Sequence, residues 1–307
     1  MAPLWMLLAT FLFSVMGACV KLASSHFTIA EIVMYRGLTG VILIGLLVIV
    51  QRGTLRTIHV RDHLWRGFVG VLSLWLWFYG ISKLPLATAV TLNYMSPIWM
   101  AAYLFCAGWW HSKDRVEWPL IVAILCSFVG VTLVLRPAFE SNQWLGAVTT
   151  LASGVLSAAA YLQVRKLSHM GEPEYRVVFY FSFVNLAAGL AGSGATVLDP
   201  AVVTFHMPDL KGAGLLLGLG VSATLAQLAM TRAYAVGKAL VVANLQYTGI
   251  IFSSVWSMLL WGDRFDWHVW VGMAIILGSG LAVTYYNTAS TDRGTAVDKS
   301  DPIASET

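Results

Sequence analysis

FYGISKLPLATAVTLNYMSPIW, residues 78–99, is echoed by RAYAVGKALVVANLQYTGIIFSSVW, residues 232–256. The match is weak but ordered, and it pairs Tyr79 with Tyr234, Lys83 with Lys238, and the run Leu92, Asn93, Tyr94 with Leu245, Gln246, Tyr247. The chain is therefore predicted to contain an internal repeat, offset by about 150 residues. If each copy crosses a membrane an odd number of times, the second copy lies upside down relative to the first.

The composition is that of a membrane protein. The 307 residues are 58% hydrophobic and only 11% charged, with a mean hydropathy of +0.74, which a soluble globule could not hide. A bilayer span needs about 20 mostly apolar residues. Nine charge-free windows are visible, at residues 1–20, 67–82, 84–112, 118–135, 141–164, 177–198, 212–231, 239–262 and 267–291, and a tenth, about 29–51, contains Arg36. We therefore predict an all-α integral membrane protein with ten transmembrane helices, arranged as two inverted five-helix repeats.

The distribution of basic residues predicts the orientation. The repeats are expected at residues 1–137 and 138–288, and the polar tail at 289–307 is expected to be disordered. Lys and Arg normally stay on the cytoplasmic side. With the N-terminus inside, the inner connections carry eleven of these residues, including Arg66, and the outer connections carry five. Both termini, and with them the tail, are therefore predicted to face the cytoplasm across an inner or plasma membrane.

Several function classes find no support in the sequence. The net charge of +4 follows from the excess of Lys and Arg in the predicted inner connections. The sequence shows no cluster of basic residues interleaved with aromatic ones, so no nucleic-acid partner is expected. His59 and His63 flank Asp62, but two histidines without further ligands are more typical of a solvated loop than of a metal site. The sequence has no HExxH, GxSxG or P-loop motif. We therefore expect no enzyme activity, catalytic residue, cofactor or metal.

The ten-span layout, the duplicated halves and three short motifs resemble the EamA branch of the drug/metabolite transporter superfamily. The motifs are the Lys-Leu-Pro turn at 83–85, the in-helix Pro97, and Trp-Gly-Asp at 261–263. The aromatic-rich helices are most similar to the YddG-type exporters of aromatic amino acids. The chain departs from the pattern at Ile250, where the first copy has Pro97, and at Asp263, where the family more often has Glu. The resemblance implies a ten-helix fold and amino acid export.

Polar residues at membrane depth are the first candidates for a solute site, because they usually face a cavity or the bundle interior. Two helical faces carry such residues at steps of three or four: Thr10, Ser14, Gly17 and Lys21 in the first span, and Thr149, Ser153, Ser157 and Tyr161 in the sixth. These stripes predict a shared central path. The alternative is that small polar residues join one helix to another.

A proline marks a second candidate. Pro97 removes the hydrogen bond to the carbonyl of Asn93, so the helix is predicted to bend beside Asn93 and Tyr94. A bend of this kind exposes backbone carbonyls to a cavity, as in the broken helices of transporters. A purely structural kink is the alternative. The second copy offers Asn244, Gln246 and Tyr247 at the matching place.

Arg36 lies inside a predicted span, where a cation needs a partner or water. It is expected to bind a solute carboxylate; the alternative is that it reaches the near interface, or pairs with Glu31 or a helix carbonyl. Gln227 of the eighth span is a further polar candidate. The aromatic residues expected to line the cavity are Trp75, Phe78, Tyr79, Trp99, Tyr161 and Tyr180.

An aromatic cavity with a few polar groups suits solutes with a modest apolar side chain. We expect a monomeric secondary transporter that exports neutral or aromatic amino acids, or similar small metabolites, by alternating access. Glu31, near an edge, is the one candidate carboxylate in the predicted spans, so flux is expected to run down the solute gradient. The alternatives are a drug or nucleotide-sugar carrier, and a membrane receptor. A nucleotide-sugar carrier would show clustered Lys or Arg in the cavity, for which Arg36 alone is a contender.

Overall fold

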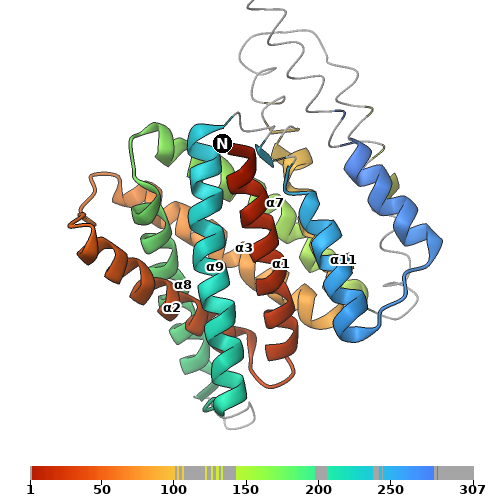
Figure 1. Cartoon of the computed structure of the whole chain (residues 1–307), viewed down its shortest axis with the longest axis horizontal. Coiled ribbons are helices and arrows are strands. Elements are labelled where there is room, and N and C mark those ends of the chain that lie inside the picture. The colour runs from red at the N-terminus through yellow and green to blue at the C-terminus, as the bar shows by residue number, and fades with distance from the viewer. Residues whose placement is uncertain are drawn as a thin grey trace, which may run out of the picture.

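The computed structural model describes residues 2–100, 102–103, 106, 122, 126, 129–130, 133, 143–197, 206–237, 242–243, 245–279 and 282. Every regular element within them is a helix, as predicted (Figure 1). The labelled helices are α1 (Ala2–Ala23), α2 (Ile29–Val50), α3 (Val60–Lys83), α4 (Leu86–Asn93), α7 (Trp144–His169), α8 (Glu174–Val197), α9 (Leu210–Val236) and α11 (Thr248–Trp261). A further apolar helix covers Trp267–Ser279.

Six of these helices are long and apolar enough to cross a membrane: α1, α2, α3, α7, α8 and α9. The shortest apolar stretch among them, Glu174–Gly194, has 21 residues, and at about 1.5 Å per residue it spans the roughly 30 Å hydrocarbon core. The multi-span membrane protein predicted from composition is thereby confirmed. Most of the predicted fifth span and the whole tail at 289–307 lie outside the described residues.

The helix contacts come in corresponding sets: a contact between one helix of the first half and one of the second has a counterpart in which the two halves change places. α1 packs against α9 and α11, while α3 and α4 pack against α7. α2 packs against α9, and α3 packs against α8. α2 also meets α8, and α4 meets α11. If α1, α2, α3 and α4 are matched with α7, α8, α9 and α11, each contact has its counterpart. Figure 1 shows α1 running beside α9.

Glycine allows α2 and α8 to approach until their backbones touch. A Cβ added at Gly37 would lie 2.4 Å from the backbone nitrogen of Leu186. A Cβ added at Gly189 would lie 2.4 Å from the backbone nitrogen of Met34. Small residues are the usual means of close helix packing in membranes, where burial of apolar surface no longer drives association. This contact sets the position of the side chains that α2 and α8 present to the centre.

The predicted bend in the fourth span is confirmed. α4 ends at Asn93, a turn covers Tyr94 and Met95, and helix resumes before Pro97. A second turn covers Gln246 and Tyr247, immediately before α11. The two breaks touch, because the Ser96 hydroxyl donates to Gln246 Oε1 at 3.3 Å.

Candidate functional site

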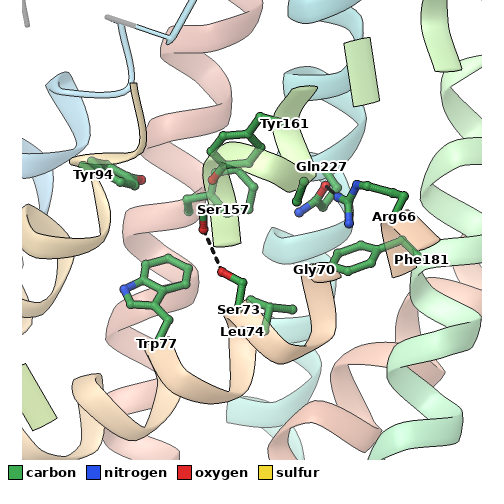
Figure 2. A pocket seen from close by; sticks show the side chains of 12 residues that line it. Arg66, Gly70, Ser73, Leu74, Trp77, Tyr94, Ser157, Tyr161, Phe181 and Gln227 are labelled. Atoms are coloured by element: carbon green, nitrogen blue, oxygen red, sulfur yellow. Dashed lines mark hydrogen bonds between the residues drawn. The ribbon is translucent and has the colours of Figure 1, made fainter. Parts of the chain in front are cut away.

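A small buried cavity lies where the two halves of the described chain meet. Its volume is about 30 Å³, which is room for about one water molecule. Helices α1, α3, α7, α8 and α9 and the turn after α4 contribute its walls (Figure 2). The lining residues are Phe13, Arg66, Gly70, Ser73, Leu74, Trp77, Tyr94, Ser157, Ala160, Tyr161, Phe181 and Gln227.

One end of the cavity is cationic. The Arg66 side chain is 2% exposed, and its guanidinium carbon lies 3.9 Å from the centroid of the Phe181 ring. Its Nη2 donates to Gln227 Oε1 over a long 3.4 Å, and Figure 2 shows the three side chains grouped together. Arg36, 3% exposed, places its guanidinium carbon 5.1 Å from the same ring. Two guanidinium groups therefore lie against one aromatic ring.

The middle of the cavity is a network of hydroxyl groups. The Ser73 and Ser157 hydroxyls are hydrogen-bonded at 2.8 Å across the cavity, as drawn in Figure 2. Asn93 Nδ2 donates to the Ser153 hydroxyl at 2.7 Å and to Ser157 at 3.3 Å. The Asn93 amide therefore ties the helix break to α7 behind the cavity wall.

Aromatic side chains close the other end. Tyr161 stacks on Tyr234, with ring centroids 5.8 Å apart and an interplanar angle of 23°. The Tyr94 ring lies against α11, where a Cβ at Gly249 would be 2.4 Å from Tyr94 Cε2. Trp77, 6% exposed, completes this end. The cavity is therefore polar and cationic at one end, and aromatic at the other.

The structure brings some of the predicted site residues together and separates others. Tyr94, Tyr161 and Gln227 line the cavity. Asn93 and Arg36 lie one contact behind its wall, through Ser157 and Phe181. The remainder lie elsewhere: Trp75 against Gly192 of α8, Phe78 and Trp99 in the apolar core, Tyr79 beside Lys83, and Gln246 and Tyr247 at the second break. Asn244 lies outside the described residues.

Two further predictions are decided by contacts. Tyr180 does not line the cavity, because it stacks on His63 and donates to the Leu55 carbonyl at 3.2 Å. Glu31 is not paired with Arg36 within the described residues. Its carboxylate caps α2 by accepting from the Thr28 backbone N–H at 2.7 Å, and it accepts from the backbone N–H of His206 at 2.6 Å. The pairing alternative for Arg36 is therefore not observed.

The placement of Arg66 in an inner connection was wrong. α3 begins at Val60, so Arg66 lies inside the helix and is buried. A search for charge-free windows ends a span at every charged residue. It therefore began this span after Arg66, although Arg66 lies inside the helix. The spacing of Arg66, Gly70, Ser73 and Trp77, at i, i+4, i+7 and i+11, places all four on one helical face and was the available signal.

A second polar cluster joins the halves at one end of the bundle. Glu172, between α7 and α8, accepts from the hydroxyl of Thr57 and from Arg176 Nη1 at 2.9 Å, while His63 Nε2 lies 3.2 Å away. Burial alone would raise the pKa of Glu172, but the hydrogen bonds from Thr57 and Arg176 and the nearby His63 ring outweigh it and hold the pKa below its ordinary value. This Glu172 cluster fastens the connection between α2 and α3 to the connection between α7 and α8.

A helical membrane bundle with a polar cavity at its centre is the architecture of a carrier, and the comparisons agree. Residues 1–136 match the EamA-like transporter family. The chain is similar to the pseudopaline exporter CntI of Pseudomonas aeruginosa, with 34% identity over 90% of this chain and 93% of that protein. It is also similar to a riboflavin transporter of Vibrio cholerae (28% identity; 94% and 95% covered) and an S-adenosylmethionine uptake transporter of Rickettsia bellii (22%; 92% of each).

The chain therefore belongs to the EamA family and is a membrane transporter, not an enzyme. A solved crystal structure shares its fold, with a TM-score of 0.67 over 93% of this chain and 97% of the other, at 16% identity. The predicted family is confirmed. The named relatives do not single out the YddG-type amino acid exporters within it.

Proposed function

We propose that this transporter moves neutral or aromatic amino acids, or similar small metabolites, out of the cell by alternating access and down the solute gradient. The observation that carries the proposal is the cavity between the halves, where guanidinium, amide and hydroxyl groups face aromatic rings. Relatives named for pseudopaline, riboflavin and S-adenosylmethionine support a metabolite as the solute.

The proposed architecture is ten helices in two inverted repeats, residues 1–137 and 138–288, with the tail at 289–307 and both termini in the cytoplasm. Helices α1, α2, α3 and α4 make contacts that correspond to those of α7, α8, α9 and α11, which supports the repeat. So do the two touching helix breaks, at Tyr94 and at Gln246. With an odd number of spans in each repeat, inversion follows. We propose a monomer, since the described lining residues come from both halves of one chain.

In the proposed mechanism, Tyr94, Tyr161 and Gln227 contact the solute. A cavity of about 30 Å³ admits no amino acid, so this conformation is a closed one. Loading requires the halves to separate at one end. The Glu172 cluster lies at such an end and would have to open for solute to pass there.

The test is counterflow of labelled amino acids in proteoliposomes, with and without an imposed pH gradient. Saturable flux that ignores the pH gradient is expected for the wild type. Gln227→Leu should reduce it at least tenfold, since the variant leaves Arg66 without its hydrogen-bond acceptor. Gln163→Leu is the matched control, because Gln163 is bonded to Asp62 at 2.9 Å, away from the cavity.

Other outcomes point to the alternatives. If no amino acid moves under any gradient, the amino acid proposal fails, and drugs and nucleotide sugars are assayed next. If flux follows the pH gradient, transport is proton-coupled and the facilitative mechanism fails. If ligands bind to the purified protein without flux, the protein acts as a receptor under these conditions.

A further inference from the structure

The cation pair at the cavity lacks a counter-charge within the described residues. Neither Arg66 nor Arg36 lies in an ion pair there, although both side chains are at least 97% buried. Nε and Nη1 of Arg66 and Nε of Arg36 are buried without a hydrogen-bond acceptor. The contacts that remain are the Phe181 ring and one long bond to Gln227.

Physical chemistry makes this arrangement unfavourable for an empty protein. An arginine side chain stays protonated even when buried, so it cannot escape the penalty by losing its proton. Buried charges are normally paired or fully hydrogen-bonded. An aromatic face compensates only part of the lost hydration, and two guanidinium groups on one ring also repel each other. An anionic group bound beside the two guanidinium groups would compensate this penalty.

We propose that the solute itself supplies the negative charge, as a carboxylate held by Arg66 and Arg36 at the Phe181 end of the cavity. This inference rests on the proposed transport function and names the chemical class of its solute. Guanidinium groups bind carboxylates through two parallel hydrogen bonds, and Arg66 has two donors without acceptors. The opposite end, formed by Trp77 and Tyr94, would receive the rest of an apolar or aromatic solute.

Local sequence supports a guanidinium held ready for a ligand. A Cβ at Gly70 would lie 2.3 Å from Arg66 Nη1 and 2.8 Å from Phe181 Cε2. The absence of a side chain at Gly70, one turn along α3, therefore leaves the space that Arg66 occupies against the ring. Gln227 holds the other nitrogen, Nη2. Arg66 is thus oriented by neutral neighbours that leave its charge unpaired.

The test compares binding of carboxylates with their matched amides to the purified full-length protein in detergent, by calorimetry. The pairs are L-phenylalanine, L-leucine, 3-phenylpropionate and succinate with the corresponding amides, and inorganic phosphate is a separate probe. At least one carboxylate should bind roughly 10- to 100-fold tighter than its amide, the discrimination typical of a charged hydrogen bond. Arg66→Gln should abolish that preference. Arg61→Gln, on an exposed position of the same helix, should keep it.

A second measurement separates ligand binding from a structural role. Without ligand, Arg66→Gln should melt at or above the wild-type temperature, because it removes an uncompensated buried charge. A structural arginine would give the opposite result. Gly70→Ala keeps the charge but displaces the guanidinium, so it should narrow the difference in affinity between a carboxylate and its matched amide.

The outcomes distinguish this inference from the function it rests on. Amino acid flux with no preference for carboxylate over amide overturns the inference and leaves the transport proposal standing. Carboxylate-selective binding that needs Arg66, without any flux, supports the inference and overturns the transport proposal. Binding of phosphate but of no carboxylate overturns the carboxylate assignment and favours a phosphate-bearing solute such as a nucleotide sugar.

Discussion

Replacing Gly37 by alanine should separate the two helices that carry Arg36 and Phe181. The added Cβ would lie 2.4 Å from the backbone nitrogen of Leu186 and 2.8 Å from both the Leu186 Cα and the Ser182 carbonyl oxygen. Ordinary contacts of a Cβ begin at 3.4 Å. Because the opposing atoms are backbone, no rotation of a side chain relieves the overlap, and α8 must move by about 1 Å.

The magnitude follows from comparison with Gly45 on the same helix, where an added Cβ meets nothing within 4 Å. At both positions alanine favours the helix by about 0.5–1 kcal/mol. Only at Gly37 does overpacking oppose it, by about 1–3 kcal/mol. The gain from replacing glycine by alanine in a helix is the same at both positions and cancels in the comparison. Gly37→Ala should therefore be less stable than Gly45→Ala by about 1–3 kcal/mol. That difference corresponds to roughly 2–10 °C in melting temperature.

The assay is thermal unfolding of both variants in one detergent, at one protein concentration, followed by intrinsic fluorescence. Carboxylate binding is measured in parallel, because Arg36 precedes Gly37 and moves with it. We expect the lower melting temperature and the weaker binding in the same variant, Gly37→Ala. Equal melting temperatures for the two variants would refute the backbone contact between α2 and α8.

Three further outcomes are expected. Glu172→Gln should destabilise the protein by about 1–3 kcal/mol in neutral buffer, because Arg176 loses a charged acceptor. The depressed pKa of Glu172 means that this stabilisation is complete above the ordinary carboxyl pKa of about 4.3 and is lost as pH falls through the lower, folded value. Asn93→Leu should lower stability by about 1–3 kcal/mol, since two serine hydroxyls lose their donor. Tyr234→Phe should cost about 1 kcal/mol through the lost bond from Gln246.

Melting curves recorded between pH 3 and pH 8 check the first outcome. Glu172→Gln should show a flatter pH profile than the wild type, and parallel profiles would contradict the role given to Glu172. Melting of Tyr234→Phe is compared with that of the wild type, and an unchanged melting temperature would contradict the bond from Gln246. Melting of Asn93→Leu is compared with that of Asn185→Leu, whose amide donates within its own helix, to the Phe181 carbonyl. A smaller effect at Asn93 than at Asn185 would argue against its role across helices.

The fold class could be predicted largely from composition, because apolar runs of about 20 residues satisfy their backbone groups in a bilayer by forming helices. The break beside Asn93 was equally predictable, since Pro97 removes a defined hydrogen bond whatever surrounds it. The repeat stays a prediction, which rests on corresponding residues at the two breaks, such as Tyr94 and Tyr247.

The site was harder to predict because it depends on how each helix is rotated about its axis. Trp75 was named in place of Trp77, its neighbour two positions on, which lines the cavity. Composition alone does not determine which of two such residues faces inward; the packing partner of α3 does. Arg66 was missed because its charge was taken as the end of a span. Gln227 could be predicted because a polar side chain inside an apolar span usually faces the bundle interior, however the helix is rotated about its axis.

The closed cavity also bears on the membrane in which the protein sits. Protons and small ions cross a bilayer along continuous files of water, and about 30 Å³ at the centre of this bundle holds about one molecule. The hydroxyls of Ser73 and Ser157 are hydrogen-bonded across that space, and because hydroxyl groups both donate and accept, they can pass a proton on where a hydrated ion does not fit. At this point of the described bundle a copy in this conformation therefore has no room for a hydrated metal ion, whatever the gradient across the membrane.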